Sequence, residues 1–115
     1  TCEDGRLLAN EGDDFFKIGH VGTSRYVDLL DHATVRAGLM AAASYNQPLC
    51  FQCAYNPYCS VLPVFNYQTQ GGLWGRMPEN GWCEKMMGIF DLLFIRLEDP
   101  GKRKELESWL QYKNN

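Results

Sequence analysis

Four cysteines in the middle of the chain constrain its fold more than any other feature. They are separated by two, five and 23 residues, and they are Cys50, Cys53, Cys59 and Cys83. Thiolates placed this close together serve as a disulfide framework, a redox pair or a metal site. The spacing and the surroundings of the four decide between these uses.

Disulfide bonds and thioredoxin-like chemistry are the less favoured uses. The chain has five cysteines, an odd number, so a complete disulfide framework would leave one thiol over. No basic segment followed by an apolar one opens the sequence, so nothing predicts secretion, and we expect a cytoplasmic protein. In a reducing compartment clustered cysteines are more often metal ligands than bridges. A redox pair of Cys50 and Cys53 is disfavoured because no βαβ unit surrounds them.

Among metal sites, the spacing favours an iron–sulfur cluster, with zinc as the alternative. A four-cysteine zinc site usually takes its ligands as two close pairs, and this chain has one such pair, Cys50 and Cys53. A [4Fe–4S] cluster is wider, so the single thiolates of Cys59 and Cys83 can reach its separate iron corners. Nearby aromatic residues would shield such a centre from water; these are Phe51, Tyr55 and Tyr58.

The cysteine segment resembles the C-terminal auxiliary domain, called SPASM or in shortened form twitch, of radical SAM enzymes that modify peptides. The resemblance rests on C-x2-C-x5-C, on P-Y-C with the trailing P-V-F-N-Y, and on the later G-W-C-E-K-M-M-G-I-F-D-L-L-F. It is closest to the His-Xaa-Ser system radical SAM maturase and covers roughly residues 3 to 97. It implies an iron–sulfur domain with a β-hairpin at its start and a ribosomally made peptide or protein as substrate.

Departures from the family pattern limit what the resemblance implies. Pro63 stands where the family places a ligand of a second cluster, and the cysteine usual in the opening hairpin is missing near Ala9. One complete set therefore remains, Cys50, Cys53, Cys59 and Cys83, and it implies one [4Fe–4S] cluster. Cys2 is either a free thiol or a remnant ligand of the missing cluster.

The signature C-x3-C-x2-C of radical SAM enzymes is absent from these residues, so S-adenosylmethionine would bind only to a catalytic barrel that this sequence does not contain. The resemblance thus implies the tail of an enzyme, not catalytic alone, whose partners are the barrel of the same natural chain and the substrate. The cluster would hold the fold and carry electrons. The alternative is a zinc-binding structural or protein-interaction domain without a redox role.

The hydrophobic pattern predicts an α+β fold. Two short strands at residues 6–9 and 15–21 would form a hairpin, followed by two helices within residues 24–44. An irregular metal-ligating loop would cover residues 45–81, and two helices would follow at residues 82–97 and 101–112. Cys83 would thus lie in the first turn of a helix, where the helix dipole stabilises a thiolate. We expect a cluster-binding domain at residues 1–98 and a helical extension at residues 99–115.

Composition and the two histidines argue against other functions. The net charge is −3, which does not favour binding to nucleic acid or to an anionic membrane, and no apolar run approaches the ~20 residues that span a bilayer. His20 and His32 lack a partner at metal-ligand spacing, so we expect surface or capping roles for them.

Overall fold

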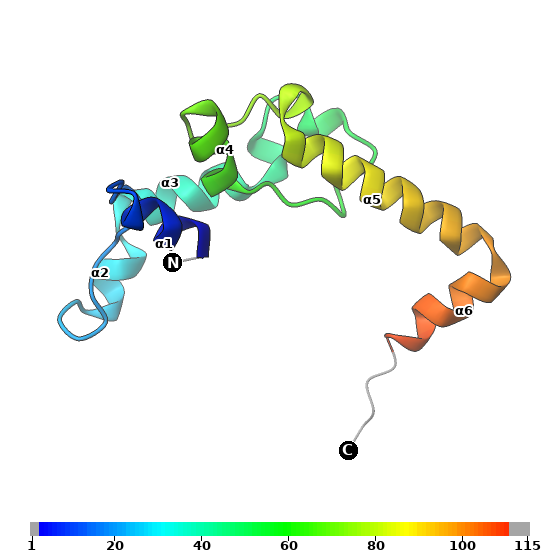
Figure 1. Cartoon of the computed structure of the whole chain (residues 1–115), viewed down its shortest axis with the longest axis horizontal. Helices are drawn as coiled ribbons and strands as arrows, with labels where there is room; N and C mark the ends of the chain where they lie inside the picture. Colours follow the sequence, from blue (N-terminus) through cyan, green and yellow to red (C-terminus); the bar gives the residue numbers. More distant parts are fainter. Residues whose placement is uncertain (1–2, 111–115) are drawn as a thin grey trace, which may run out of the picture.

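A computed structural model describes residues 3–110, and within that range the chain is helical, without a β-strand. Cys2, whose role the sequence leaves open, lies outside the described residues. The helices follow one another along the chain in the order shown in Figure 1. The six α-helices are α1 (Glu3–Asn10), α2 (Tyr26–Leu30), α3 (Ala33–Ala42), α4 (Pro63–Gln70), α5 (Gly81–Glu98) and α6 (Pro100–Ser108). Three single 3₁₀ turns lie between α3 and α5: η1 (Ser44–Asn46), η2 (Cys50–Gln52) and η3 (Met77–Glu79).

The predicted N-terminal hairpin is wrong, and with it the α+β class. Residues 6–9 lie in α1, and residues 15–21 form no strand. The turn expected between the two is present, but it ends a helix at Gly12, whose φ of 94° suits glycine. Phe15 and Phe16, taken as strand residues, pack on Tyr67 with ring centroids 4.6 and 5.2 Å apart. Phe15 and Phe16 therefore contribute to tertiary packing and do not form part of a strand.

The prediction of two helices within residues 24–44 is correct in number, with α2 at Tyr26–Leu30 and α3 at Ala33–Ala42. α2 and α3 are separated at Asp31 and His32. The side chain of His32 caps α3 by accepting a hydrogen bond from the Thr34 amide at 3.2 Å, and His20 Nδ1 accepts one from the Gly22 amide at 3.1 Å. Both histidines therefore have the local hydrogen-bonding roles that the sequence predicts.

The segment expected to be an irregular loop contains a helix that the sequence analysis missed. α4 begins at Pro63. A proline is tolerated there because the first-turn amides of a helix have no partner within the helix, so its missing N–H costs no hydrogen bond. The helix is capped at its C-terminus by Gly71 in the left-handed conformation. Both signals are readable in the sequence. Outside α4, residues 45–80 form 3₁₀ turns, other turns, bends and irregular segments, which agrees with the predicted irregular loop, and Gly81 already belongs to α5.

α5, predicted at residues 82–97, is one residue longer at each end, whereas α6, predicted at residues 101–112, begins at Pro100 and ends at Ser108. Residues 109 and 110 form a turn, and residues 111 and 112 lie outside the described residues. Asn80 caps α5 and Asp99 caps α6, so the chain turns at Asp99 and Pro100. α5 leads away from the remaining helices, and α6 turns back at its end (Figure 1). Among the described residues no helix is both long enough and apolar enough to cross a bilayer.

The buried core is small and lies between α1, α3, α4 and the segment after the cysteines. Its apolar members are Leu8, Ala41, Val61, Val64 and Met77. Four polar residues are buried beside them: Gln47, Asn56, Asn66 and Asn80. The core therefore contains side-chain amides as well as apolar side chains, and each of the four donates a hydrogen bond through its amide nitrogen.

Candidate metal centre

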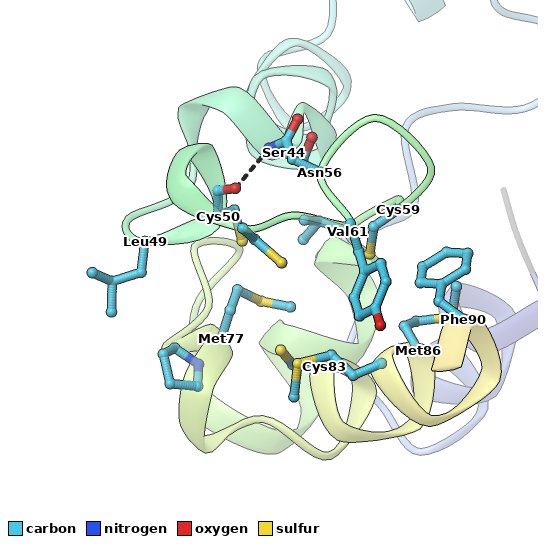
Figure 2. A pocket seen from close by; sticks show the side chains of 14 residues that line it. Ser44, Leu49, Cys50, Asn56, Cys59, Val61, Met77, Cys83, Met86 and Phe90 are labelled. Carbon is cyan, nitrogen blue, oxygen red and sulfur yellow. Dashed lines mark hydrogen bonds between the residues drawn. The ribbon is translucent and has the colours of Figure 1, made fainter. Parts of the chain in front are cut away.

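The structure brings the four predicted cysteines to the wall of one cavity. The cavity has a volume of about 250 Å³ and lies between the segment that carries Cys50, Cys53 and Cys59 and the first turns of α5, which carry Cys83. The thiols of Cys50, Cys59 and Cys83 approach it from different sides in Figure 2. All four thiols are free and half-buried.

Short-range backbone bonds fold the cysteine segment into consecutive turns. The Cys53 amide donates to the Cys50 carbonyl at 3.0 Å, and the Cys59 amide donates to Tyr55 at 3.0 Å. Asn56 lies between these turns, and its Nδ2 donates to the Cys50 carbonyl at 2.8 Å. Each turn thus places the next thiol on the same side of the segment, toward the cavity.

α5 supplies the opposite wall. Cys83 is its third residue, as predicted, and the indole Nε1 of Trp82 donates to the Ser60 carbonyl at 2.9 Å. Tyr55 packs on Phe90 and Phe94 and donates its hydroxyl to the Asp91 carboxylate, which raises the pKa of the Tyr55 hydroxyl. These contacts fix α5 against the cysteine segment, so the distance between Cys83 and the other thiols is set by packing.

Burial and mutual proximity raise the pKa of three thiols. For each of the three, burial is the largest cause of the raised pKa, and the charges of neighbouring thiols add to it. The pKa of Cys50 is raised further by Cys83, Cys59 and Cys53. That of Cys59 is raised further by Cys83 and Cys53, and that of Cys83 by Cys53. The predicted stabilisation of the Cys83 thiolate by the helix dipole is therefore outweighed.

The remaining lining is apolar and sulfur-rich. Besides Tyr55 and Phe90, it comprises Leu49, Val61, Met77, Pro78, Met86 and Met87, with Ser44 and Asn56 as its polar members. Of the aromatic residues expected to shield the centre, Tyr55 does line the cavity. Phe51 and Tyr58 do not line it and are 59% and 62% exposed.

Two features of this wall were not identified from the sequence. Leu49 adopts the left-handed conformation with φ 69°, directly before the first cysteine, which strains a residue other than glycine. Asn56 is 6% exposed, and its Oδ1 is buried without a hydrogen-bond partner. The sequence shows that Asn56 lies between Cys53 and Cys59. It does not show that this side chain is buried, because asparagine is common in exposed turns.

The donor set at this cavity has the chemistry of a polynuclear iron–sulfur site. Four thiols are the ligand number of a [4Fe–4S] cluster, and the cavity greatly exceeds the ~10–15 Å³ that one water molecule needs. Within residues 3–110, no three His, Cys, Asp or Glu side chains are grouped so as to hold a single metal ion. Comparisons with protein-family models, curated proteins and solved structures find no match to this chain.

Proposed function

We propose that Cys50, Cys53, Cys59 and Cys83 hold one [4Fe–4S] cluster. The observation that carries this proposal is their convergence on one cavity, although 23 residues separate Cys83 from Cys59. The single thiols of Cys59 and Cys83, which do not form a second close pair, suit the separate corners of a cluster better than one zinc ion. The sequence resemblance to SPASM and twitch domains points to the same centre.

The chain's own residues would position the centre and keep water from it. When bound, the cluster would accept and release single electrons, and four thiolates would occupy all four irons. Tyr55 and Phe90 cover it on the side of α5, and exclusion of water by such walls tunes the reduction potential of a cluster. The strained Leu49 holds Cys50 in its turn, and strain of this kind is typical of ligand-binding segments.

On the wider function, we infer an auxiliary domain of a cytoplasmic radical SAM enzyme that modifies a ribosomally made peptide or protein. The support for this inference is the sequence resemblance. The cluster would stabilise the domain and transfer electrons, while S-adenosylmethionine would bind to a barrel elsewhere in the natural protein. A reducing compartment suits free half-buried thiols.

Anaerobic reconstitution with iron and sulfide tests the cluster. We expect a brown protein with about four irons per chain, as a [4Fe–4S] cluster requires. Replacement of any one of the four cavity cysteines by serine is expected to lower the iron content severely. The Cys2→Ser variant is the matched control and is expected to keep the full content.

Two outcomes would contradict the cluster. A colourless protein that takes up one zinc ion in the presence of both metals under anaerobic conditions would support a zinc-binding interaction domain. A Cys83→Ser variant with unchanged iron would show that the cavity does not hold the centre.

The gene tests the wider function separately. We expect the reading frame upstream of the codon for Thr1 to encode a C-x3-C-x2-C motif within a catalytic barrel. An upstream frame without that motif would contradict the radical SAM assignment and leave the cluster itself unaffected.

A further inference from the structure

One face of α5 has no partner within the described chain, and it lies opposite the cysteine cavity. Met86 and Phe90 line the cavity, whereas Ile89, Leu92 and Ile95 point to the other side by helical spacing. The exposed fractions of these three are 40%, 52% and 65%. Figure 1 shows this part of α5 leading away from α1 to α4, with α6 at its end. The face therefore exposes neighbouring aliphatic side chains. Single exposed apolar residues are common on protein surfaces, but a contiguous group of them is typical of an interaction site.

Gly88 lies on the same face and has no role in the packing of the single chain. A Cβ at Gly88 would meet no atom within 4 Å, and its backbone is helical. Glycine inside a helix costs roughly 0.5–1 kcal/mol relative to alanine. A small residue at an exposed helix position lets another backbone or a long side chain approach closely. Gly88 thus points independently to a partner on this face.

The residues of this face are arranged symmetrically about Leu92. Ile89 and Ile95 lie three residues to either side of Leu92, and Gly88 and Arg96 lie four residues to either side. If two copies of α5 pack antiparallel with a two-fold axis at Leu92, each isoleucine meets the isoleucine of the other copy. Each Arg96 then lies over Gly88 of the other copy, where the missing side chain leaves room. A two-fold interface requires this kind of self-complementarity.

Charge follows the same symmetry. Lys85 and Asp99 lie seven residues to either side of Leu92. Lys85 is on α5, whereas Asp99 directly follows the last residue of α5, Glu98, and its Oδ1 caps α6. The antiparallel arrangement places Lys85 of one copy beside Asp99 of the other at both ends of the interface. Neither Lys85 nor Arg96 forms a salt bridge with any residue in the range 3–110. Such rim pairs add little affinity but fix register and orientation.

We propose that the chain forms a two-fold symmetric dimer through this face of α5, defined by Lys85, Gly88, Ile89, Leu92, Ile95 and Arg96, together with Asp99, which follows the helix. The occupant of the face is a second copy, because the apolar residues, the glycine and the charges are complementary to themselves. Since the interface is small, we expect a dissociation constant on the order of 1 µM or weaker. The proposal does not depend on the metal, because the cavity lies on the other side of the helix.

Sedimentation velocity of the full chain, at concentrations on both sides of this value, tests the dimer. We expect a mass that rises from the 13.1 kDa of one chain toward twice that value. The Leu92→Glu variant is expected to weaken association by at least ~10-fold, because it places two carboxylates together at the axis. The Gly88→Phe variant is also expected to weaken it, although a Cβ at Gly88 meets no atom of the single chain within 4 Å.

Leu39→Glu is the matched control. Leu39 is 68% exposed and lies on α3, so its replacement is expected to leave association unchanged. Circular dichroism verifies that every variant keeps its helices. A chain that stays monomeric at all concentrations, or a dimer that Leu39→Glu disrupts and Leu92→Glu does not, would overturn the proposal.

Zero-length cross-linking tests the antiparallel register. A carbodiimide joins the Lys85 amine to the Asp99 carboxyl with loss of water, and a mixture of unlabelled and ¹⁵N-labelled chains identifies links between copies. We expect Lys85–Asp99 peptides of mixed label. Mixed-label peptides that join Lys17 to a carboxyl group, with no Lys85–Asp99 peptide among them, would contradict the arrangement.

Discussion

At the scale of single residues, buried amides determine how the segment between α4 and α5 is held. Asn66 is fully buried, its Nδ2 donates to the Leu73 carbonyl at 3.1 Å, and its Oδ1 accepts from Asn80 Nδ2 at 2.8 Å. Asn80 in turn caps α5 by accepting from the Trp82 amide. This chain of bonds connects α4 to the helix that carries Cys83.

Gly75 packs directly on the Asn66 amide and provides a test of this arrangement. A Cβ at Gly75 would lie 2.8 Å from the Asn66 side chain, which its hydrogen bonds hold in place. We expect Gly75→Ala to lower the free energy of unfolding by about 1–3 kcal/mol, the usual cost of overpacking. Urea unfolding of the reconstituted protein measures this change.

Gly72→Ala is the control for Gly75→Ala, because its nearest atom, the Trp74 carbonyl oxygen, would be 3.9 Å away, an ordinary contact. We expect little loss of stability for this variant. Equal stability of the two variants would show that Asn66 shifts freely to admit the extra methyl group.

At the scale of elements, the junction of α5 and α6 depends on one carboxylate. Asp99 Oδ1 accepts hydrogen bonds from the Gly101 and Lys102 amides at 2.7 and 3.2 Å, and these bonds, with that of Lys102 first, lower the pKa of Asp99. Pro100 supplies the first helical residue. The cap and the proline together set where the chain turns.

We expect Asp99→Ala to reduce the helical content of α6, whereas Asp99→Asn keeps a capping oxygen and most of the helix. Because folding lowers the pKa of Asp99, its capping contribution is fully present above about pH 4, the ordinary pKa, and is lost as the pH falls through the folded value. Secondary chemical shifts of residues 100–108 between pH 2 and 7 measure this. A pH profile for Asp99→Asn that matches wild type would contradict a role for the carboxylate charge.

The elements that the sequence predicted correctly carry their own start and stop signals. Asp99 with Pro100 defines α6, and the apolar period of residues 82–97 defines α5. The hairpin was predicted because Phe15 and Phe16 have high strand propensity. In the structure both pack on Tyr67, which lies 51 residues or more further along the chain, and local propensity carries no information about such a contact. α4 was missed although Pro63 and Gly71 mark both of its ends.

At the scale of the whole molecule, the protein is extended for its length. The radius of gyration is 17.8 Å, against roughly 13 Å for a compact domain of this size. α5 and α6 contain no buried residue, and the buried apolar side chains are few. A core of this size gives little stability to the turns around Cys50, Cys53 and Cys59.

The candidate site residues could be predicted from the sequence, whereas the surroundings of the site could not. Cysteine spacing singled out the four thiols, because metal ligands are few and chemically distinctive. Other features of the site depend on tertiary packing, about which cysteine spacing gives no information. These are the left-handed backbone of Leu49, the burial of Asn56 and the position of Met77 in the cavity wall. For the same reason the symmetric face of α5 became visible only when its lack of a partner was known.

Removal of the metal centre is expected to loosen the cysteine segment selectively. The amides of Cys53, Asn56 and Cys59 donate only short-range bonds within the turns, so ligand bonds would supply most of their stability. We expect hydrogen exchange at these amides to be at least ~10-fold faster in the chelated protein than in the reconstituted one. Amides in residues 92–97 of α5 lie beyond the cavity and are expected to exchange alike in both, since their helical bonds do not involve the centre. Equal exchange of the cysteine segment in both states would mean that packing alone holds the turns, and that the four thiols do not contribute to folding through a shared metal.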